Sequence, residues 1–367
     1  MTSASISFDK RVTPAGRRLL AQCLFLMLVI ALGLNIPLAG LNSEFVVEQA
    51  QSERSGMHRL SIFALAASPL LSVLLLLELA KLIFPRLETW RISNERNALG
   101  LHVLVMLLVT GVAAMSGYGL VYSFQVANIT NISDGYAIAG IASYVGATIA
   151  MIWFAGRIRL VEITGALWLL LAIFYLPDFG RELLVLIEYS RMGAISSWQG
   201  LLYCALLLAG ILVLVAINRT IELSARNDVT EKSFLLSALL WPPFLAAFIA
   251  SYLVAVPYVF LAELLSIYAP SFIFFIFEII QAVLIPLILL AYYRFIRIYR
   301  PDIACQDHVR PLLLCIAGIQ LALGLGLALA KIFVGFPVAL SGNILIVSIT
   351  VLYLIGTVLR PGKPMNA

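Results

Sequence analysis

Residues 60–88 read LSIFALAASPLLSVLLLLELAKLIFPRLE, and this stretch decides the fold class. Most of it is an apolar run long enough to cross a bilayer as a helix. Pro69 lies near the middle of the run, where it removes one backbone hydrogen bond and is expected to bend the helix. Such a bend is tolerated in lipid where a neighbouring helix or a cavity relieves it. The stretch therefore predicts a kinked membrane span that packs against other spans and leaves the membrane at residues 85–88.

The rest of the chain has the same apolar character. Hydrophobic residues make up 62% of its 367 residues, and charged residues only 12%. Soluble domains do not reach this balance, whereas membrane proteins with many spans do. We predict an all-α polytopic membrane protein with ten apolar windows: 19–38, 60–80, 98–124, 136–155, 160–177, 197–217, 234–256, 269–293, 311–335 and 341–359.

Charge placement predicts the orientation of these spans. If the N-terminus is inside, the inside segments hold most of the 24 Lys and Arg residues, as the positive-inside rule requires. Both termini are therefore expected on the cytoplasmic side. The net charge of +5 follows from the same bias and requires no nucleic-acid partner. The first apolar run lacks a small-residue cleavage site, so we expect a retained span rather than a signal peptide.

An internal repeat predicts two halves of five spans each. Pro69 in the second window corresponds to Pro242-Pro243 in the seventh, and Thr164-Gly165 in the fifth corresponds to Ser341-Gly342 in the tenth. Because five is odd, the second half must be inverted, an arrangement typical of transporters with a path between their halves. The predicted organisation is a cytoplasmic segment 1–18, an N-terminal half 19–177, an external connection 178–196, a C-terminal half 197–359 and a cytoplasmic tail 360–367.

Side chains suited to catalysis are sparse. The 3 histidines and 4 cysteines are scattered and match no metal-ligand or nucleophile spacing, so we expect no enzyme activity, metal or cofactor. Glu278 and Gln281 share one helix face inside the eighth window, where a carboxylate is costly and usually faces water or a partner. They line an aqueous funnel, bond to another helix, or form a proton-coupled site, and the sequence leaves these three readings open.

Several separated blocks resemble SecY, the protein-conducting channel subunit of the Sec translocon. Residues 60–88 resemble the second helix of that family and its cytosolic exit. Residues 146–172, GATIAMIWFAGRIRLVEITGALWLLLA, resemble its fourth helix, tight loop and fifth helix. Weaker matches at 35–40, 242–251 and 341–347 follow in the family's order. Residues 41–59 lack the family's apolar plug helix and the inside loops are short, so the chain looks like a divergent, reduced member.

The resemblance implies a channel that passes secretory polypeptides across, or inserts membrane proteins into, the bacterial inner (plasma) membrane, without chemistry of its own. The family closes its pore with an apolar ring from helices two, five, seven and ten, and an apolar constriction dewets and resists ions. The matching ring positions are Ala67, Leu71, Leu167, Leu171, Phe244, Ile346 and Val347. Helices two and seven form the lateral gate, here at Ala66, Ser68, Pro69, Ser72, Pro242, Ala246, Ala247 and Ser251. Small and hydroxyl residues suit close helix packing.

The partners follow from the same resemblance. It implies a SecE-like small membrane subunit and leaves a SecG-like subunit open. Docking of the SecA motor or the ribosome is also open, because the inside loops are short. The basic residues that would serve it are Arg219, Arg226, Arg294, Arg297, Arg300 and Arg310. The alternative function is an inverted-repeat secondary transporter of a small solute, which needs converging polar groups at mid-membrane. Glu278 is essentially the only ionisable residue expected there, which disfavours ion-coupled transport.

Overall fold

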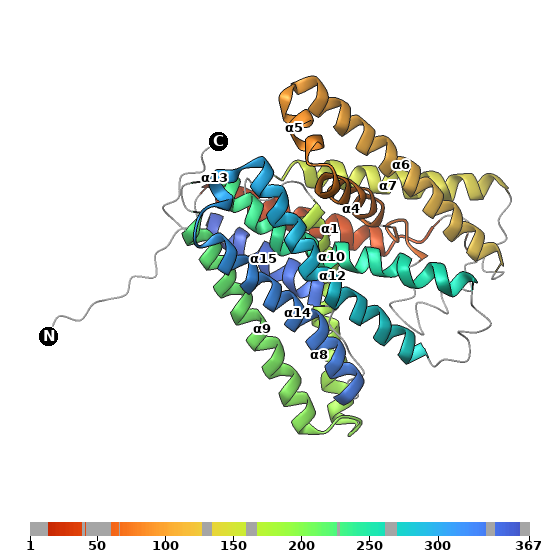
Figure 1. Ribbon diagram of the computed structural model, residues 1–367. Helices are drawn as coiled ribbons and strands as arrows, with labels where there is room; N and C mark the ends of the chain where they lie inside the picture. The colour runs from red at the N-terminus through yellow and green to blue at the C-terminus, as the bar shows by residue number, and fades with distance from the viewer. Residues whose placement is uncertain are drawn as a thin grey trace.

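The computed structural model describes residues 14–38, 41, 60–65, 67–126, 134–158, 167–225, 228–260, 270–334 and 342–359 (Figure 1). Within these residues the regular structure is helical, apart from an isolated antiparallel bridge between Pro37 and Ser61. The helices are α1 (Pro14–Leu34), α4 (Ser68–Ile83), α5 (Arg86–Ser93), α6 (Glu95–Val126), α7 (Asp134–Gly156), α8 (Leu167–Arg191), α9 (Ser197–Ser224), α10 (Val229–Phe260), α12 (Pro270–Tyr299), α13 (Pro301–Ala304), α14 (Val309–Val334) and α15 (Gly342–Leu359).

Eight helices of the described residues are long and apolar enough to cross a bilayer. They lie in α1, α6, α7, α9, α10, α12, α14 and α15 and match eight of the ten predicted windows. A polytopic, all-helical membrane protein is therefore confirmed, but a count of ten spans is not. The two remaining windows, 60–80 and 160–177, correspond to α4 and α8, whose apolar parts are shorter than a full span.

The start of α4 corrects the prediction for Pro69. The helix begins at Ser68, so Pro69 occupies its first turn rather than the middle of a span. A proline in the first turn lacks an N–H that would be unpaired in any case, so it starts the helix without bending it. Residues 60–62 instead pair with the segment that follows α1: the Leu38 N–H donates to the Leu60 carbonyl and the Ile62 N–H to the Ile36 carbonyl. The prediction of a kink inside this span is wrong.

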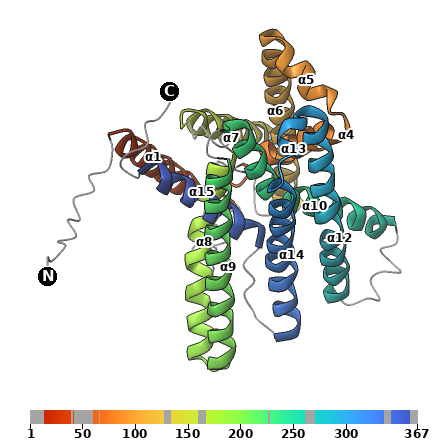
Figure 2. The same ribbon diagram turned by 60° about the vertical axis from the view of Figure 1, so that its left-hand side comes forward.

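The helix α8 is longer than the apolar window that predicted it. Its apolar part ends at Leu176, but the helix continues to Arg191, through part of the predicted external connection. Gly193, with φ of 72°, then turns the chain, and Ser196 starts α9 with a capping box in which its hydroxyl and Gln199 pair reciprocally. Figure 2 shows α8 and α9 side by side as a long hairpin.

Several helices also extend beyond their windows on the predicted cytoplasmic side. The windows end at 217 and 293, whereas α9 runs to Ser224 and α12 to Tyr299. Hydropathy detects only the part of a helix that lies in lipid, and polar residues continue the same helix into water. Large side chains such as Leu107, Leu212 and Leu290 are at least 60% exposed along the outer faces, which is the surface that lipid would cover.

The helices pack around one large apolar core. Buried residues from α1, α4, α6, α7, α8, α9, α10, α12, α14 and α15 form a single hydrophobic cluster. A smaller cluster joins Leu38, Leu60 and Leu65 to Val121 and Phe124 of α6 and Tyr144 of α7. The larger cluster contains the residues that the sequence predicts at the pore ring. Helices α4, α8, α10 and α15 therefore position the candidate site.

Candidate functional site

The predicted ring residues lie together in the large hydrophobic cluster. Ala67, Leu167, Leu171, Ile346 and Val347 are buried, and Leu71 and Phe244 are half-buried against the same cluster. They come from the N-cap and first turn of α4 and from α8, α10 and α15, and α15 packs on both α8 and α10 while α10 packs on α4. The same cluster runs through most of the bundle, so the assignment of a ring stays a prediction.

Trp168 is the residue that sequence reasoning missed at this site. Its side chain is 1% exposed, and its ring stands edge-on to Trp241 with centroids 4.7 Å apart. It also contacts the predicted ring residue Phe244, at 5.6 Å between centroids. The signal in the sequence was its position beside Leu167 and three residues before Leu171, on the same helix. We call the seven predicted ring residues together with Trp168 and Trp241 the waist.

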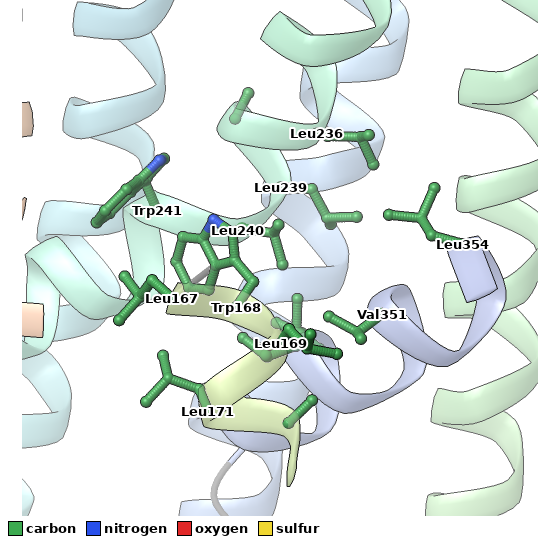
Figure 3. Packing of buried hydrophobic residues seen from close by; sticks show 14 of the residues in the cluster. Leu167, Trp168, Leu169, Leu171, Leu236, Leu239, Leu240, Trp241, Val351 and Leu354 are labelled. Carbon is green, nitrogen blue, oxygen red and sulfur yellow. The ribbon is translucent and has the colours of Figure 1, made fainter. Parts of the chain in front are cut away.

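Aromatic side chains from α8 and α10 pack against each other in the waist. Figure 3 shows the ring of Trp168 beside that of Trp241, with Leu167 and Leu171 one turn apart on α8. Edge-to-face aromatic pairs add about 0.5–1.5 kcal/mol to the stabilisation from buried area. If this cluster is the constriction of a pore, as the SecY resemblance implies, it would exclude water and ions, because neither finds a polar group there.

The described gate residues lie on α4 and α10, two helices that pack against each other. Ala246 and both prolines of the Pro242-Pro243 pair are buried, whereas Ser251 is exposed and Ala247 is half-buried. Ser68, Ser72 and Ser251 donate their hydroxyl hydrogens to carbonyls of their own chain segment, those of Leu65, Ser68 and Phe248. Such hydroxyls do not tie the two helices together. Ala66 lies outside the described residues, and the gate assignment remains a prediction.

A buried carboxylate that sequence reasoning missed joins α4 to α12. Glu78 is 8% exposed; Tyr292 donates its hydroxyl hydrogen to Glu78 Oε1 at 2.5 Å, and Lys81 Nζ lies 2.9 Å from the same carboxylate. The Lys81 ammonium also lies 5.3 Å from the ring centroid of Phe295. Every oxygen in this group has a partner within the helices, so the charge is satisfied locally. Glu78 therefore links α4 to α12, and its pairing does not favour a proton-coupled site.

Replacing Tyr292 by phenylalanine is expected to loosen this link. The change removes one hydrogen bond to a charged acceptor, which costs about 2 kcal/mol. Thermal unfolding of the purified protein measures the loss, and Tyr122→Phe on α6 is the matched control because that side chain is 55% exposed. Equal unfolding midpoints for the two variants would contradict a stabilising role for the Glu78–Tyr292 contact.

The polar pair predicted on the eighth window lies on α12. Glu278 and Gln281 are both half-buried there. This exposure fits a funnel wall and a structural hydrogen bond equally well, so the alternatives stand as the sequence left them. The predicted plug region is residues 41–59. Apart from Leu41, it lies outside the described residues.

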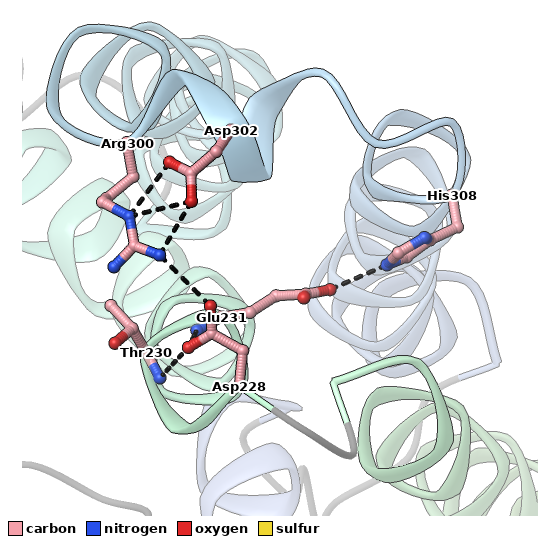
Figure 4. Close-up of polar contacts among 6 residues, drawn as sticks. All are labelled: Asp228, Thr230, Glu231, Arg300, Asp302 and His308. Carbon is pink, nitrogen blue, oxygen red and sulfur yellow. Dashed lines mark hydrogen bonds and ion pairs between the residues drawn. The ribbon is translucent and has the colours of Figure 1, made fainter.

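A polar cluster joins the ends of α10, α12 and α14 (Figure 4). Asp228 caps α10 by accepting the backbone N–H groups of Thr230 and Glu231. Arg300 donates to Asp228 at 3.2 Å and to Asp302 at 2.8 Å. His308 Nε2 lies 2.7 Å from Glu231 Oε1, which connects the start of α14 to the first turn of α10.

Protonation of the two aspartates weakens this cluster. Burial tends to raise the pKa of Asp228, but the backbone N–H groups of Thr230 and Glu231 and the charge of Arg300 outweigh it and lower that pKa. The hydrogen bond from Arg300 likewise lowers the pKa of Asp302. Because the pKa is lowered on folding, each carboxylate stabilises the folded state at a pH above its ordinary pKa near 3.8. This stabilisation is lost as the pH falls through the lowered pKa.

The predicted docking arginines differ in solvent exposure and in the contacts that they already make within the protein. Arg219, Arg294 and Arg297 are exposed. Arg300 is held by Asp228 and Asp302, and Arg310, although exposed, donates to the Tyr293 hydroxyl at 2.7 Å. Arg226 lies outside the described residues. Docking at these positions stays a prediction.

Comparison with known proteins gives a distant but consistent result. No protein-family model matches the chain. It is similar to the protein translocase subunit SecY of Rickettsia bellii (strain RML369-C), with 23% identity over 227 residues, or 57% of this chain and 51% of that protein. The SecY of Rickettsia felis (strain ATCC VR-1525 / URRWXCal2) is 24% identical over 247 residues, or 61% of this chain and 55% of that protein. The chain spans about half the length of the curated relatives it matches.

These similarities agree with the resemblance inferred from the quoted blocks. At 22–24% identity over part of each protein, they support a distant SecY-like relationship and do not favour the small-solute transporter. The chain is a multi-pass membrane protein with a distant, partial similarity to SecY.

Proposed function

We propose that the chain is a SecY-like channel that conducts unfolded polypeptides across the bacterial plasma membrane or releases them into it. The observation that carries this proposal is the similarity to two translocase SecY subunits over 57% and 61% of the chain. The closed, apolar waist supports it, because such a channel must resist ions when no polypeptide occupies it. The protein itself catalyses no reaction in this proposal.

The order in which the helices pack supports two equivalent halves. If α1, α4, α6, α7 and α8 form the first half and α9, α10, α12, α14 and α15 the second, then α4 packs on α6 as α10 packs on α12. Likewise α6 packs on α7 as α12 on α14, and α7 on α8 as α14 on α15. These three neighbour relations agree between the proposed halves. Inversion of the second half is part of the proposal, because it requires that α4 and α8 also count as crossings.

Contacts between the halves follow the same rule. The first helix of the first half, α1, packs on the last helix of the second half, α15. The first helix of the second half, α9, packs in the same way on the last helix of the first half, α8. The fifth element, α8, packs on its own counterpart α15, and the second, α4, packs on its counterpart α10. In a two-fold arrangement, counterparts that contact each other lie beside the axis, so the proposed axis would pass between the members of each of these two pairs. In this arrangement the waist lies where a polypeptide would cross between the halves.

The proposed partners are those that the SecY resemblance implies. They are a SecE-like small membrane subunit, the lipid bilayer and the polypeptide substrate, with a SecG-like subunit and the SecA motor or ribosome left open. Energy for movement would come from such a partner or from chain synthesis, since the proposed channel supplies none. The exposed arginines Arg219, Arg294 and Arg297 are the candidate contacts on the cytoplasmic side.

Site-specific crosslinking tests the proposed function. A photoreactive residue at position 71 or 244 is expected to form adducts with a secretory chain stalled during translocation, because both half-buried positions belong to the waist. The control is position 107 on α6, where the native leucine is 66% exposed on the outer face. Absence of adducts from the waist, together with robust uptake of a small solute, would favour the transporter instead.

A further inference from the structure

The seventh predicted span, α10, continues through the adjacent prolines Pro242 and Pro243, which break its ladder of backbone hydrogen bonds. In an α-helix the N–H of each residue donates to the carbonyl four residues earlier. Proline has no N–H, so these two prolines leave the carbonyls of Ala238 and Leu239 without their helical donors. Both residues are 0% exposed, so water cannot replace the missing donors. Unpaired carbonyls at such depth in a membrane cost several kcal/mol each.

A single side chain from another helix supplies both missing donors. Gln320 of α14 is 1% exposed, and its Nε2 donates to the Ala238 carbonyl at 3.0 Å and to the Leu239 carbonyl at 2.8 Å. A primary amide carries two N–H hydrogens, so one group satisfies two acceptors. The two carbonyls also fix the orientation of the amide, because the opposite assignment would set an oxygen against two oxygens. The Gln320 Oε1 atom has no hydrogen-bond partner in the described structure.

The supported break lies within the waist. Trp241 immediately precedes the prolines and Phe244 immediately follows them, and both rings contact Trp168 of α8. A helix without two consecutive hydrogen bonds bends at low cost unless another group holds it. The geometry of the break therefore determines where these two rings meet Trp168.

We propose that Gln320 is a positioning residue that holds α10 at the Pro242-Pro243 break and so keeps the waist sealed in the idle state. The inference rests on the proposed function. With the amide in place, α10 has one preferred bend and the aromatic rings remain in contact. Without it, the two carbonyls seek other donors, α10 samples other bends, and the seal opens intermittently.

A mutant cycle tests whether Gln320 acts through the missing N–H groups. Gln320→Leu removes the donor at similar size, and the pair Pro242→Ala and Pro243→Ala restores both helical donors. In the native background, Gln320→Leu is expected to raise the population of alternative α10 bends about tenfold or more. In the double-alanine background, Gln320→Leu is expected to leave the α10 conformation unchanged or to stabilise it. The backbone N–H groups at 242 and 243 then donate to the Ala238 and Leu239 carbonyls, so the amide is no longer needed. Pro257→Ala, at an exposed proline of the same helix, is the control and should not cancel the effect of Gln320→Leu.

Two readouts on the full-length protein follow the cycle. The first is the distance distribution between spin labels at positions 229 and 253, where the native Val and Leu are 63% and 54% exposed on either side of the break. The second is potassium leak from proteoliposomes that contain the idle protein. Gln320→Leu should broaden the distribution and raise the leak, and the double-alanine change should reverse both. If Gln320→Leu fails to fold, recovery of folding by the double-alanine change supports the inference, and continued failure overturns it.

The outcomes separate this inference from the proposed function. An unchanged distance distribution for Gln320→Leu overturns the positioning role, whatever the crosslinking of substrates shows. A broadened distribution without additional leak overturns the link to the seal. A broadened distribution with additional leak, but without polypeptide adducts from the waist, supports the role of Gln320 while the proposed function fails.

Discussion

Replacing Gly342 by alanine is expected to destabilise the protein strongly, because the added methyl would meet backbone atoms of another helix. A Cβ at this position would lie 2.5 Å from the Leu323 carbonyl oxygen, 2.6 Å from its carbonyl carbon and 2.9 Å from the Gly324 nitrogen. All three are backbone atoms of α14, so no side-chain rotation can relieve the overlap. The two helices must separate, at a cost near the upper end of overpacking effects, about 3 kcal/mol.

This effect would reach the waist through α15. Gly342 is the first residue of that helix, and Ile346 and Val347 follow within two turns. The measurement is the free energy of unfolding in detergent, together with the amount of protein in the membrane. Gly356→Ala is the matched control, because no atom lies within 4 Å of a Cβ added there on the same helix. It should be neutral or stabilising by up to about 1 kcal/mol. Similar values for the two variants would contradict the close approach of α14 and α15.

Replacing Trp168 by alanine is the second change with a large expected effect. Its fully buried ring fills the space between Trp241 and Phe244, and removing a buried aromatic side chain of this size costs about 3–5 kcal/mol. The cavity would also lie in the waist, so the idle protein should leak ions. Trp168→Phe keeps an aromatic ring and should retain most of the seal.

Unfolding and ion flux measured on the same preparations separate the two effects. Trp198→Ala is the control for stability and leak, because that side chain is 71% exposed. A Trp168→Ala protein that is destabilised yet remains as ion-tight as the control would place the barrier away from the waist.

Hydropathy predicted the fold class and eight spans because each span must be apolar along its length to lie in lipid. It could not show that Pro69 starts a helix rather than bends one, because residues 60–62 pair with the segment after α1 and hydropathy does not detect such pairing. It also could not show how far helices such as α9 and α12 extend into water, where apolar character ends but hydrogen bonding continues.

The candidate site was predictable only where a motif carried it. The resemblance to SecY supplied the ring and gate positions, and the structure brings the described ring residues into one cluster. Trp168, Glu78 and Gln320 were missed because their roles depend on partners far away in sequence: Phe244, Tyr292 and the carbonyls of Ala238 and Leu239. The proline pair itself could have indicated Gln320, because two orphaned buried carbonyls require a donor from somewhere.

Cysteine accessibility at Leu171 tests most directly whether the waist is the path of a polypeptide. The background would lack the four native cysteines, Cys23, Cys204, Cys305 and Cys315. In sealed vesicles, a membrane-impermeant maleimide should not label a cysteine at position 171 in the idle protein, where the native leucine is 3% exposed. With a translocating chain trapped in the protein, the waist must widen and admit water, so the same cysteine should become labelled. Lack of labelling in both states, alongside normal transport of the same polypeptide when it is not trapped, would contradict a path between the halves.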